Sequence, residues 1–168
     1  MEEESRQLDP EAAGDHIDRL YRAAVALSGS PQLAEDLVQE TYVKVLSRPR
    51  FIRRDDDLAY LMRALRNVWY SELRGRGSRP AQTELSPEEV GSSTRIGDPE
   101  LSLEAGDVLG AVAALPDEFR EVVAAVDIGG LSYAQAAKAL GIPEGTVMSR
   151  LARGRTRIAE QLGAEENG

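Results

Sequence analysis

The segment 131–157 constrains the fold of this 168-residue chain more than any other part of the sequence. Ser132 is followed three residues later by Gln135, which is the pattern of a helix capping box. Gly141 suits the left-handed backbone conformation of a tight turn, and Pro143 suits the first position of a following helix. The spacing therefore predicts two helices joined by a sharp turn, which is the arrangement of a helix-turn-helix.

The second helix of this motif has an outward face that suits DNA. Thr146, Arg150, Arg153 and Arg157 recur at helical spacing, and Ser149 lies beside them. Hydroxyl and guanidinium groups on one helix face fit the major groove, where arginine reads guanine or holds phosphate. We predict that this helix contacts duplex DNA. The alternative is an ordinary helical corner whose arginines form a solvated surface.

The rest of the chain also has helical periodicity. Helices are expected over 10–28, over 31–47 and from 55–57 to Gly75, with Asp9 and Ser30 as the first two N-caps. Helical patterns resume at 103–115 and from Pro116 to Gly129, and no strand pattern of any length is present. The predicted fold is all-α. It has two small helical domains, residues 10–78 and a helix-turn-helix domain 105–163, joined by an acidic flexible linker 79–104.

Charge is unevenly distributed in this acidic chain. The net charge is −9, yet residues 48–79 hold nine arginines against four acids, and residues 138–157 hold five basic residues against one acid. Two basic islands favour two nucleic-acid contacts, whereas the alternative is that both are solvated helix faces.

Several classes of protein do not fit this composition. The absence of cysteine and the single histidine exclude a disulfide, a Cys-ligated zinc and a multi-His metal cluster within one chain. No catalytic motif is present, so we predict no enzyme activity, no cofactor and no metal. No apolar run approaches the roughly 18–20 residues that span a bilayer. Because the N-terminus is acidic rather than basic and apolar, no signal peptide is expected either, and the predicted location is cytoplasmic.

Several segments resemble one family. Residues 115–122, 130–133 and 145–155 closely resemble the promoter-reading C-terminal module of the sigma factors of bacterial RNA polymerase. Residues 34–45 are similar to the polymerase-binding helix of that family, and residues 60–67 to the helix that opens promoter DNA. Two modules around an acidic linker resemble the small extracytoplasmic-function (ECF) group. The resemblance covers the chain from about residue 17 to residue 162.

The resemblance implies a subunit that binds core RNA polymerase and directs promoter recognition, DNA opening and transcription initiation. It implies core polymerase, promoter DNA and an anti-sigma factor as partners. On the helix 31–47, polar residues outside the apolar stripe would be costly to bury, so they form either a docking face or a plain solvated face. The resemblance favours docking on polymerase through Asp36, Gln39, Glu40, Val43 and Lys44.

The resemblance also assigns the two DNA contacts. Aromatic residues interleaved with arginines suit unstacked bases, and the loop 49–56 is expected to capture a flipped base. Trp69 belongs either to this contact or to the core. The predicted contacts of the downstream promoter element are Phe51, Arg53, Arg54, Tyr60, Arg63, Arg66, Asn67, Tyr70 and Arg74. Those of the upstream element are Ser132, Tyr133, Thr146, Ser149, Arg150, Arg153 and Arg157.

The chain departs from the family pattern in a few places. Tyr60 stands where tryptophan is commoner, Ser71 where an acid or amide is commoner, and Met148 where a basic residue is frequent. The acidic first eight residues match nothing in the family, so their role is open. A different reading of the motifs is a helix-turn-helix regulator that acts as a dimer on operator DNA.

Overall fold

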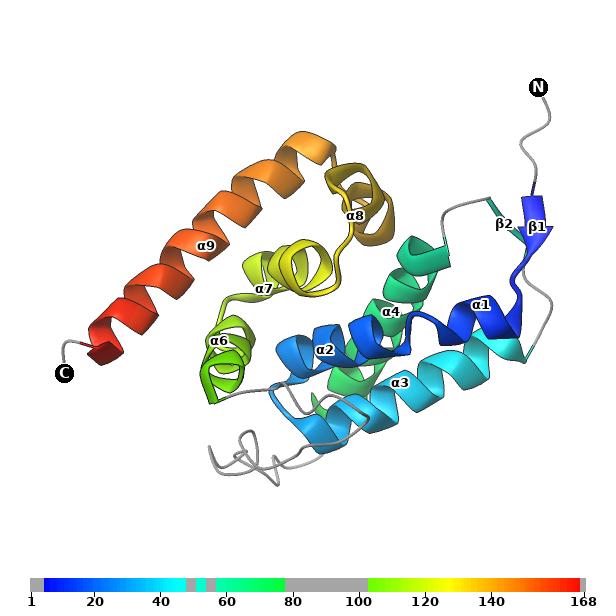
Figure 1. The fold of residues 1–168 in the computed structure, drawn as a ribbon, viewed down its shortest axis with the longest axis horizontal. Coiled ribbons are helices and arrows are strands. Elements are labelled where there is room, and N and C mark those ends of the chain that lie inside the picture. Colours follow the sequence, from blue (N-terminus) through cyan, green and yellow to red (C-terminus); the bar gives the residue numbers. More distant parts are fainter. Residues whose placement is uncertain (1–4, 48–50, 54–56, 78–102, 167–168) are drawn as a thin grey trace.

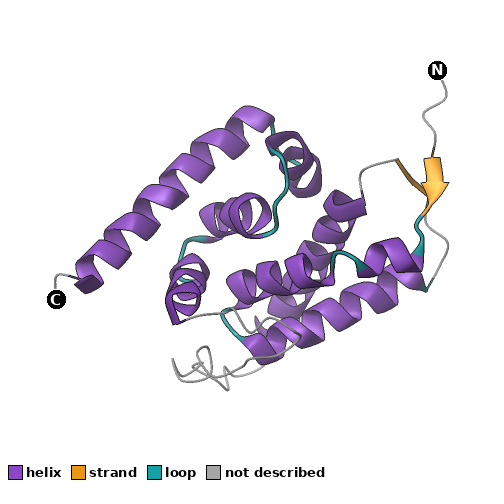
Figure 2. Cartoon of the chain, viewed as in Figure 1, coloured by secondary structure: helices purple, strands orange, loops and turns teal. Residues whose placement is uncertain are grey.

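The computed structural model describes residues 5–47, 51–53, 57–77 and 103–166. Helices make up most of these residues, and one two-stranded ribbon accompanies them, so the all-α prediction is confirmed (Figure 1, Figure 2). In chain order the elements are β1 Ser5–Gln7, α1 Pro10–Gly14, α2 Ile17–Ser28, α3 Pro31–Leu46, β2 Phe51–Arg53, α4 Asp57–Gly77, α6 Leu103–Ala113, α7 Asp117–Val123, the π-helical turn η1 Ala124–Ile128, α8 Tyr133–Leu140 and α9 Glu144–Glu166. None of the helices in these ranges is both long enough and apolar enough to span a bilayer.

The N-terminal half is built on α2, α3 and α4. Helix α3 packs against both α2 and α4, and the fully buried side chains of Leu20, Leu37 and Leu65 fill the space between the helices. The predicted N-caps are confirmed. The Asp9 carboxylate accepts a hydrogen bond from the Glu11 amide at 3.1 Å, and the Ser30 hydroxyl accepts one from the Leu33 amide at 3.2 Å.

The single helix expected over 10–28 is interrupted. Helix α1 ends at Gly14 and α2 begins at Ile17. The amides of Asp15 and His16 bond three residues back, as in a 3₁₀ turn, and the carbonyl of Ala13 accepts a hydrogen bond from the Tyr42 hydroxyl. The Ala13 carbonyl therefore accepts two hydrogen bonds, one from the His16 amide and one from Tyr42 on α3.

One short ribbon accompanies the helices, although no strand pattern in the sequence indicated it. Strands β1 and β2 pair in antiparallel register, with Ser5 opposite Arg53 and Gln7 opposite Phe51. Each strand has three residues, which is too short for an alternating pattern to be recognisable, and the partners are far apart in the sequence.

The C-terminal half contains the predicted helix-turn-helix. Ser132 and Gln135 form both hydrogen bonds of the capping box, at 3.1 Å and 2.9 Å, and Gly141 ends α8 with a φ of 68°. Helix α9 crosses α7 closely at Gly154, because a Cβ there would lie 2.7 Å from a methyl group of Val123. The inward stripe of α9 includes the buried Val147 and Leu151.

The two halves pack against each other rather than standing apart. Helix α2 contacts α6, α7 and η1, and α4 contacts α8 (Figure 1). Buried residues of both halves belong to one continuous hydrophobic core. The absence of a side chain at Gly129 allows this contact, since a Cβ there would lie 2.5 Å from Met62 Cε of α4.

Candidate nucleic-acid interface

An apolar groove of about 840 Å³ runs along the exposed side of α3. Two of its lining side chains are large hydrophobic residues with high exposure, Val43 at 63% and Leu46 at 42%. Exposed apolar clusters of this kind are typical of interaction sites. The groove is lined by Ile17, Glu35, Val38, Gln39, Tyr42, Val43, Leu46 and Ser47.

The residues predicted to dock on a partner all lie on or beside this groove side of α3. Gln39 and Val43 line the groove, while Asp36, Glu40 and Lys44 are exposed on the same helix. Glu40 and Lys44 form an ion pair of 3.3 Å one helical turn apart. The face therefore combines aliphatic contact area with charged groups.

Sequence reasoning missed part of this groove. Leu46 was detectable as an apolar residue one turn after Tyr42, on the edge of the buried stripe. Ile17 was not detectable, because it belongs to α2 and meets α3 only through packing of the two helices.

Helix α4 presents one face to solvent and the opposite face to the core. Arg63, Asn67 and Arg74 are exposed, and Tyr60 and Tyr70 are partly exposed. These five residues follow one another at intervals of three or four, so they form one stripe of the helix. The structure therefore brings together five of the predicted downstream-element contacts.

The other predicted contacts near α4 have different surroundings. Trp69 is buried among the core residues, which decides in favour of the core alternative. Phe51 and Arg53 form β2, but their side chains are outside the part of the chain that the structure describes, as is all of Arg54. Most of the predicted linker 79–104 is outside the described residues too.

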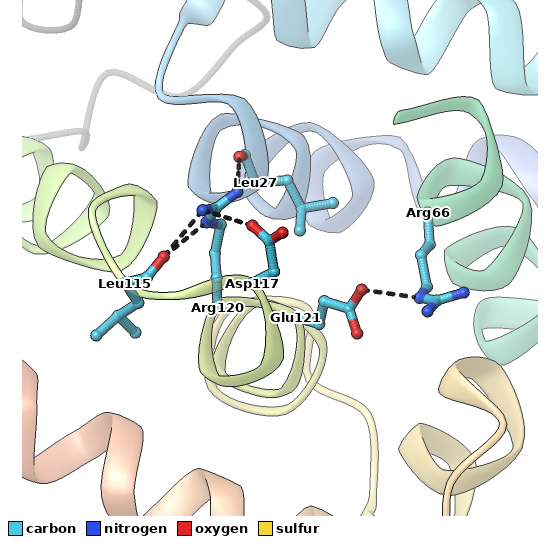
Figure 3. A network of polar contacts seen from close by, with 6 residues as sticks. All are labelled: Leu27, Arg66, Leu115, Asp117, Arg120 and Glu121. Atoms are coloured by element: carbon cyan, nitrogen blue, oxygen red, sulfur yellow. Dashed lines mark hydrogen bonds and ion pairs between the residues drawn. The ribbon is translucent and has the colours of Figure 1, made fainter. Parts of the chain in front are cut away.

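Arg66 joins the two halves of the molecule. Its Nε donates a hydrogen bond of 3.2 Å to Oε1 of Glu121 on α7 (Figure 3). Its guanidinium also lies 4.8 Å from the ring centre of Tyr70. The Glu121 side chain is only 10% exposed. Burial raises the pKa of Glu121 above its usual range, and the nearby Arg66 and Arg150 lower it only in part.

Arg120 forms a second polar connection between the halves. It donates to the Leu115 carbonyl at 2.9 Å and 3.2 Å, to the Leu27 carbonyl at 3.5 Å, and pairs with Asp117 at 2.9 Å (Figure 3). Leu27 lies in the last turn of α2, where helix carbonyls lack partners within the helix. Nothing in the local sequence pattern indicated this role for Arg120.

The outward face of α9 is partly as predicted. Arg153 and Ser149 are exposed and Thr146 is partly exposed, with the Ser149 hydroxyl donating to the Thr146 carbonyl at 3.2 Å. Arg150 is half-buried on the side of α9 that faces Glu121. The Arg157 guanidinium lies 4.9 Å from the ring centre of Phe119.

Two neighbours of this face have structural roles. Arg155 donates two hydrogen bonds to the Asp127 carboxylate, at 2.9 Å and 2.6 Å, which ties α9 to η1. The Ser132 hydroxyl caps α8, and Tyr133 is half-buried against the core. Met148 is exposed, so its side chain is available at the surface of α9.

The described ranges hold no group of three or more histidine, aspartate or glutamate side chains that could bind a metal ion. What the arrangement offers is surface: one apolar groove with charged flanks on α3, one cationic and aromatic stripe on α4, and one hydroxyl and guanidinium face on α9.

Comparison with known proteins gives matches in both halves. The family model of Sigma-70 region 2 matches residues 13–79, and that of Sigma-70, region 4 matches residues 105–158. The chain is 33% identical to ECF RNA polymerase sigma factor SigE of Mycolicibacterium smegmatis, over 90% of this chain and 60% of that protein. The chain thus spans less than two thirds of that relative's length.

Two further relatives are covered more completely. The chain is 32% identical to ECF RNA polymerase sigma factor EcfG of Rhodopseudomonas palustris, over 90% of this chain and 85% of that protein. Its fold resembles that of the sigma factor RpoE in complex with the anti-sigma factor NepR from Bartonella quintana. The TM-score is 0.68, the identity 29%, and the match covers 91% of this chain and 95% of that one.

Proposed function

The chain belongs to the ECF sigma factors of bacterial RNA polymerase, and from this membership we propose how its surfaces divide the work of transcription initiation. The N-terminal domain, residues 10–78, binds core polymerase and the melted downstream promoter element. The C-terminal domain, residues 105–163, reads the upstream element as duplex DNA. The alternative of a dimeric operator-binding regulator is not favoured, because both halves match sigma regions.

The observation that carries this proposal is the separation of three different surfaces on one chain. The α3 groove is apolar with charged flanks, which suits a protein partner. The α4 stripe combines aromatic, cationic and amide side chains, which suits a single strand. The α9 face offers hydroxyls and guanidinium groups, which suit base edges and phosphates of a duplex.

Docking on polymerase occurs through the α3 surface. Val43 and Leu46 supply exposed apolar area that a helix of core polymerase covers, and Asp36 and Glu40 supply negative charge toward a basic partner. The family resemblance implies that the partner is the clamp of the largest polymerase subunit.

DNA opening uses α4 and the preceding loop. Arg63, Asn67 and Arg74 contact the backbone and edges of the separated strand, and Tyr60 and Tyr70 offer rings on which bases stack. Stacking of a base on an aromatic ring contributes about 1–3 kcal/mol. Strand separation therefore gains stabilisation that paired, stacked bases cannot receive.

Duplex recognition uses the first turns of α9 in the major groove. Thr146, Ser149 and Arg153 lie on the accessible part of this helix. Each domain alone binds DNA weakly, and polymerase holds both at a fixed spacing, so that binding by one raises the effective concentration of the other. The protein has no catalysis of its own, acts in the cytoplasm where polymerase transcribes, and is restrained by an anti-sigma factor that covers these surfaces.

Run-off transcription with core polymerase and a promoter library tests the proposal. The chain should direct initiation from a small set of promoters, and the free chain should bind the same DNA weakly. Asp36→Arg with Glu40→Arg should abolish co-purification with core polymerase while changing the unfolding temperature of the isolated chain only slightly, because both side chains and the ion pair of Glu40 with Lys44 are exposed. A matched control is Glu118→Arg, an exposed acid on α7. Retained co-purification by the double variant would contradict the docking surface.

A further inference from the structure

We propose that β1 is a positioning element for promoter opening: it holds the backbone of β2, within the base-capturing loop, in an extended conformation before DNA arrives. The inference rests on the proposed function of that loop. It assigns a role to the N-terminal segment, for which the family resemblance offers none.

The pairing of the two strands connects the N-terminal segment to the predicted contact residues themselves. Gln7 lies opposite Phe51, and Ser5 lies opposite Arg53. Phe51 and Arg53 are both predicted to contact the downstream promoter element. The backbone groups that β1 occupies therefore belong to the residues whose side chains the function requires in place.

The N-terminal strand is firmly attached at its C-terminal end. Leu8, the next residue, is 4% exposed and belongs to the hydrophobic core. Asp9 then caps α1, and α1 contacts α4. The Ala13 carbonyl, near the end of α1, accepts a hydrogen bond from the Tyr42 hydroxyl of α3. Strand β1 is consequently an extension of the folded domain rather than a loose tail.

The second strand is next to the helix that contacts DNA. Strand β2 packs near α4, and α4 begins at Asp57 with Asp57 and Leu58 buried. The ribbon thus connects the N-terminal segment to the N-terminal end of α4. The exposed stripe of α4, which begins with Tyr60 and Arg63, starts at this end.

The energetic reason is preorganisation. Fixing one backbone residue in a single conformation costs about 1–2 kcal/mol, and a loop that is ordered only when DNA binds loses that free energy from the affinity. A ribbon of two three-residue strands is marginal by itself. Its attachment through Leu8 places β1 beside β2 at high effective concentration, which stabilises the pairing without DNA.

The test uses the full chain with core polymerase. Alternate residues of a strand direct their N–H groups toward the paired strand, so either Arg6 or Gln7 donates a hydrogen bond to β2. Because proline has no N–H group, the double variant Arg6→Pro with Gln7→Pro removes this donor whichever of the two residues supplies it. Arg6→Ala with Gln7→Ala is the matched control, since it changes the same side chains and keeps both N–H groups. A deletion of residues 2–7, which retains Leu8 and the Asp9 cap, provides a second variant that breaks the ribbon.

Two measurements report on each variant. Amide hydrogen exchange of residues 51–53 in the free chain reports the pairing directly. Binding of holoenzyme to a promoter fork whose downstream element is unpaired reports the function. We expect both ribbon-breaking variants to lose protection at 51–53 and to bind the fork about 5- to 30-fold more weakly, with unchanged affinity for core polymerase. The alanine variant should match the wild-type chain in both measurements.

Other results would overturn the inference. It fails when 51–53 exchange freely in the wild-type chain, or when the ribbon-breaking variants bind the fork as tightly as the wild type. It also fails when Glu2→Gln, Glu3→Gln and Glu4→Gln together reproduce the change, since the acidic charge rather than the ribbon would then be responsible. Failure of the proposed function is distinguishable, because the wild-type chain would then direct no initiation with core polymerase.

Discussion

Replacing Arg66 by methionine should destabilise the protein by an amount that depends on Glu121. The Nε–Oε1 hydrogen bond is 3.2 Å long, and the two side chains are 30% and 10% exposed. A hydrogen bond to a charged group contributes about 1.5–3 kcal/mol. Because solvent screens the partly exposed guanidinium, we expect Arg66→Met to lower the free energy of unfolding by about 1–2 kcal/mol at pH 7.5.

The carboxylate is the source of most of this loss. Arg66→Met removes the hydrogen-bond partner of a nearly buried carboxyl group and leaves the charge of Arg150 as a weaker compensation. In a Glu121→Gln background this position carries no buried charge. Arg66→Met should then lower the free energy of unfolding by less than about 0.5 kcal/mol, apart from the lost contact with the Tyr70 ring. That contact is lost in both backgrounds and cancels in the double-mutant cycle.

The effect should also depend on pH. The pKa of Glu121 is raised in the folded protein, so its contribution to stability is complete below the unfolded pKa and is lost as pH rises through the folded pKa. Removing Arg66 raises that pKa further and deepens the loss at neutral pH. As pH falls below the unfolded pKa the carboxyl becomes neutral in both states, and the coupling should become smaller.

Urea denaturation followed by circular dichroism measures the four unfolding free energies of this cycle. Measurements at pH 7.5 and at the lowest pH where the chain stays folded give the coupling under both conditions. A coupling free energy within about 0.3 kcal/mol of zero at pH 7.5 would refute the reasoning, as would equal coupling at both pH values.

Three other predictions follow from contacts at single residues. Gly129→Ala should lower the free energy of unfolding by about 1–3 kcal/mol, because the new Cβ would lie 2.9 Å from the Ala125 carbonyl oxygen and against the end of Met62. Gly110→Ala, with nothing within 4 Å of the new Cβ, should raise it by about 0.5–1 kcal/mol, and equal effects in urea denaturation would contradict the crowding at Gly129. Arg153→Ala should weaken binding of the upstream element by holoenzyme by about 1–3 kcal/mol. Arg155→Ala should instead lower the unfolding temperature, because the hydrogen bonds to Asp127 are lost. The reverse pattern would show that the roles of the two arginines are wrongly assigned. Tyr42→Phe should lower the free energy of unfolding by about 0.5–1.5 kcal/mol at pH 7, because the hydrogen bond to Ala13 is lost. Since burial raises the pKa of Tyr42 to about 12, the wild type should also lose stability between about pH 10 and 12, whereas the variant should not. A spectroscopic titration that finds no tyrosine with a raised pKa would contradict this prediction.

Features that depend on neighbours in the chain could be predicted from the sequence. The capping box of Ser132 and Gln135, the left-handed Gly141 and the Ser30 cap each involve residues at most three positions apart or a single backbone conformation. Helical periodicity likewise identified which side of α3 and α9 is buried, because that side repeats every three or four residues.

The candidate surfaces could be predicted only in part. The family resemblance assigned Arg63, Asn67 and Arg74 to the DNA contact, and periodicity identified the buried residues of the same helix; all three assigned residues are exposed. It could not decide whether Trp69 belongs to the core or to the contact, because the residue lies at the edge of the buried stripe. The groove beside α3 needs Ile17, which comes from a different helix.

The sequence by itself determined the class of fold, the positions of most helices, the helix-turn-helix and the identity of the family, since all of these reside in local hydrogen bonds, periodicity and short motifs. Only the tertiary structure decided the hydrogen bond of Tyr42 to Ala13 at the break in the first helix, the ribbon of β1 with β2, and the joining of the two halves through Arg66 and Glu121. Each of these interactions pairs groups more than 25 positions apart in the chain. No local pattern encodes such a pairing, because it depends on where helix packing brings the two segments together.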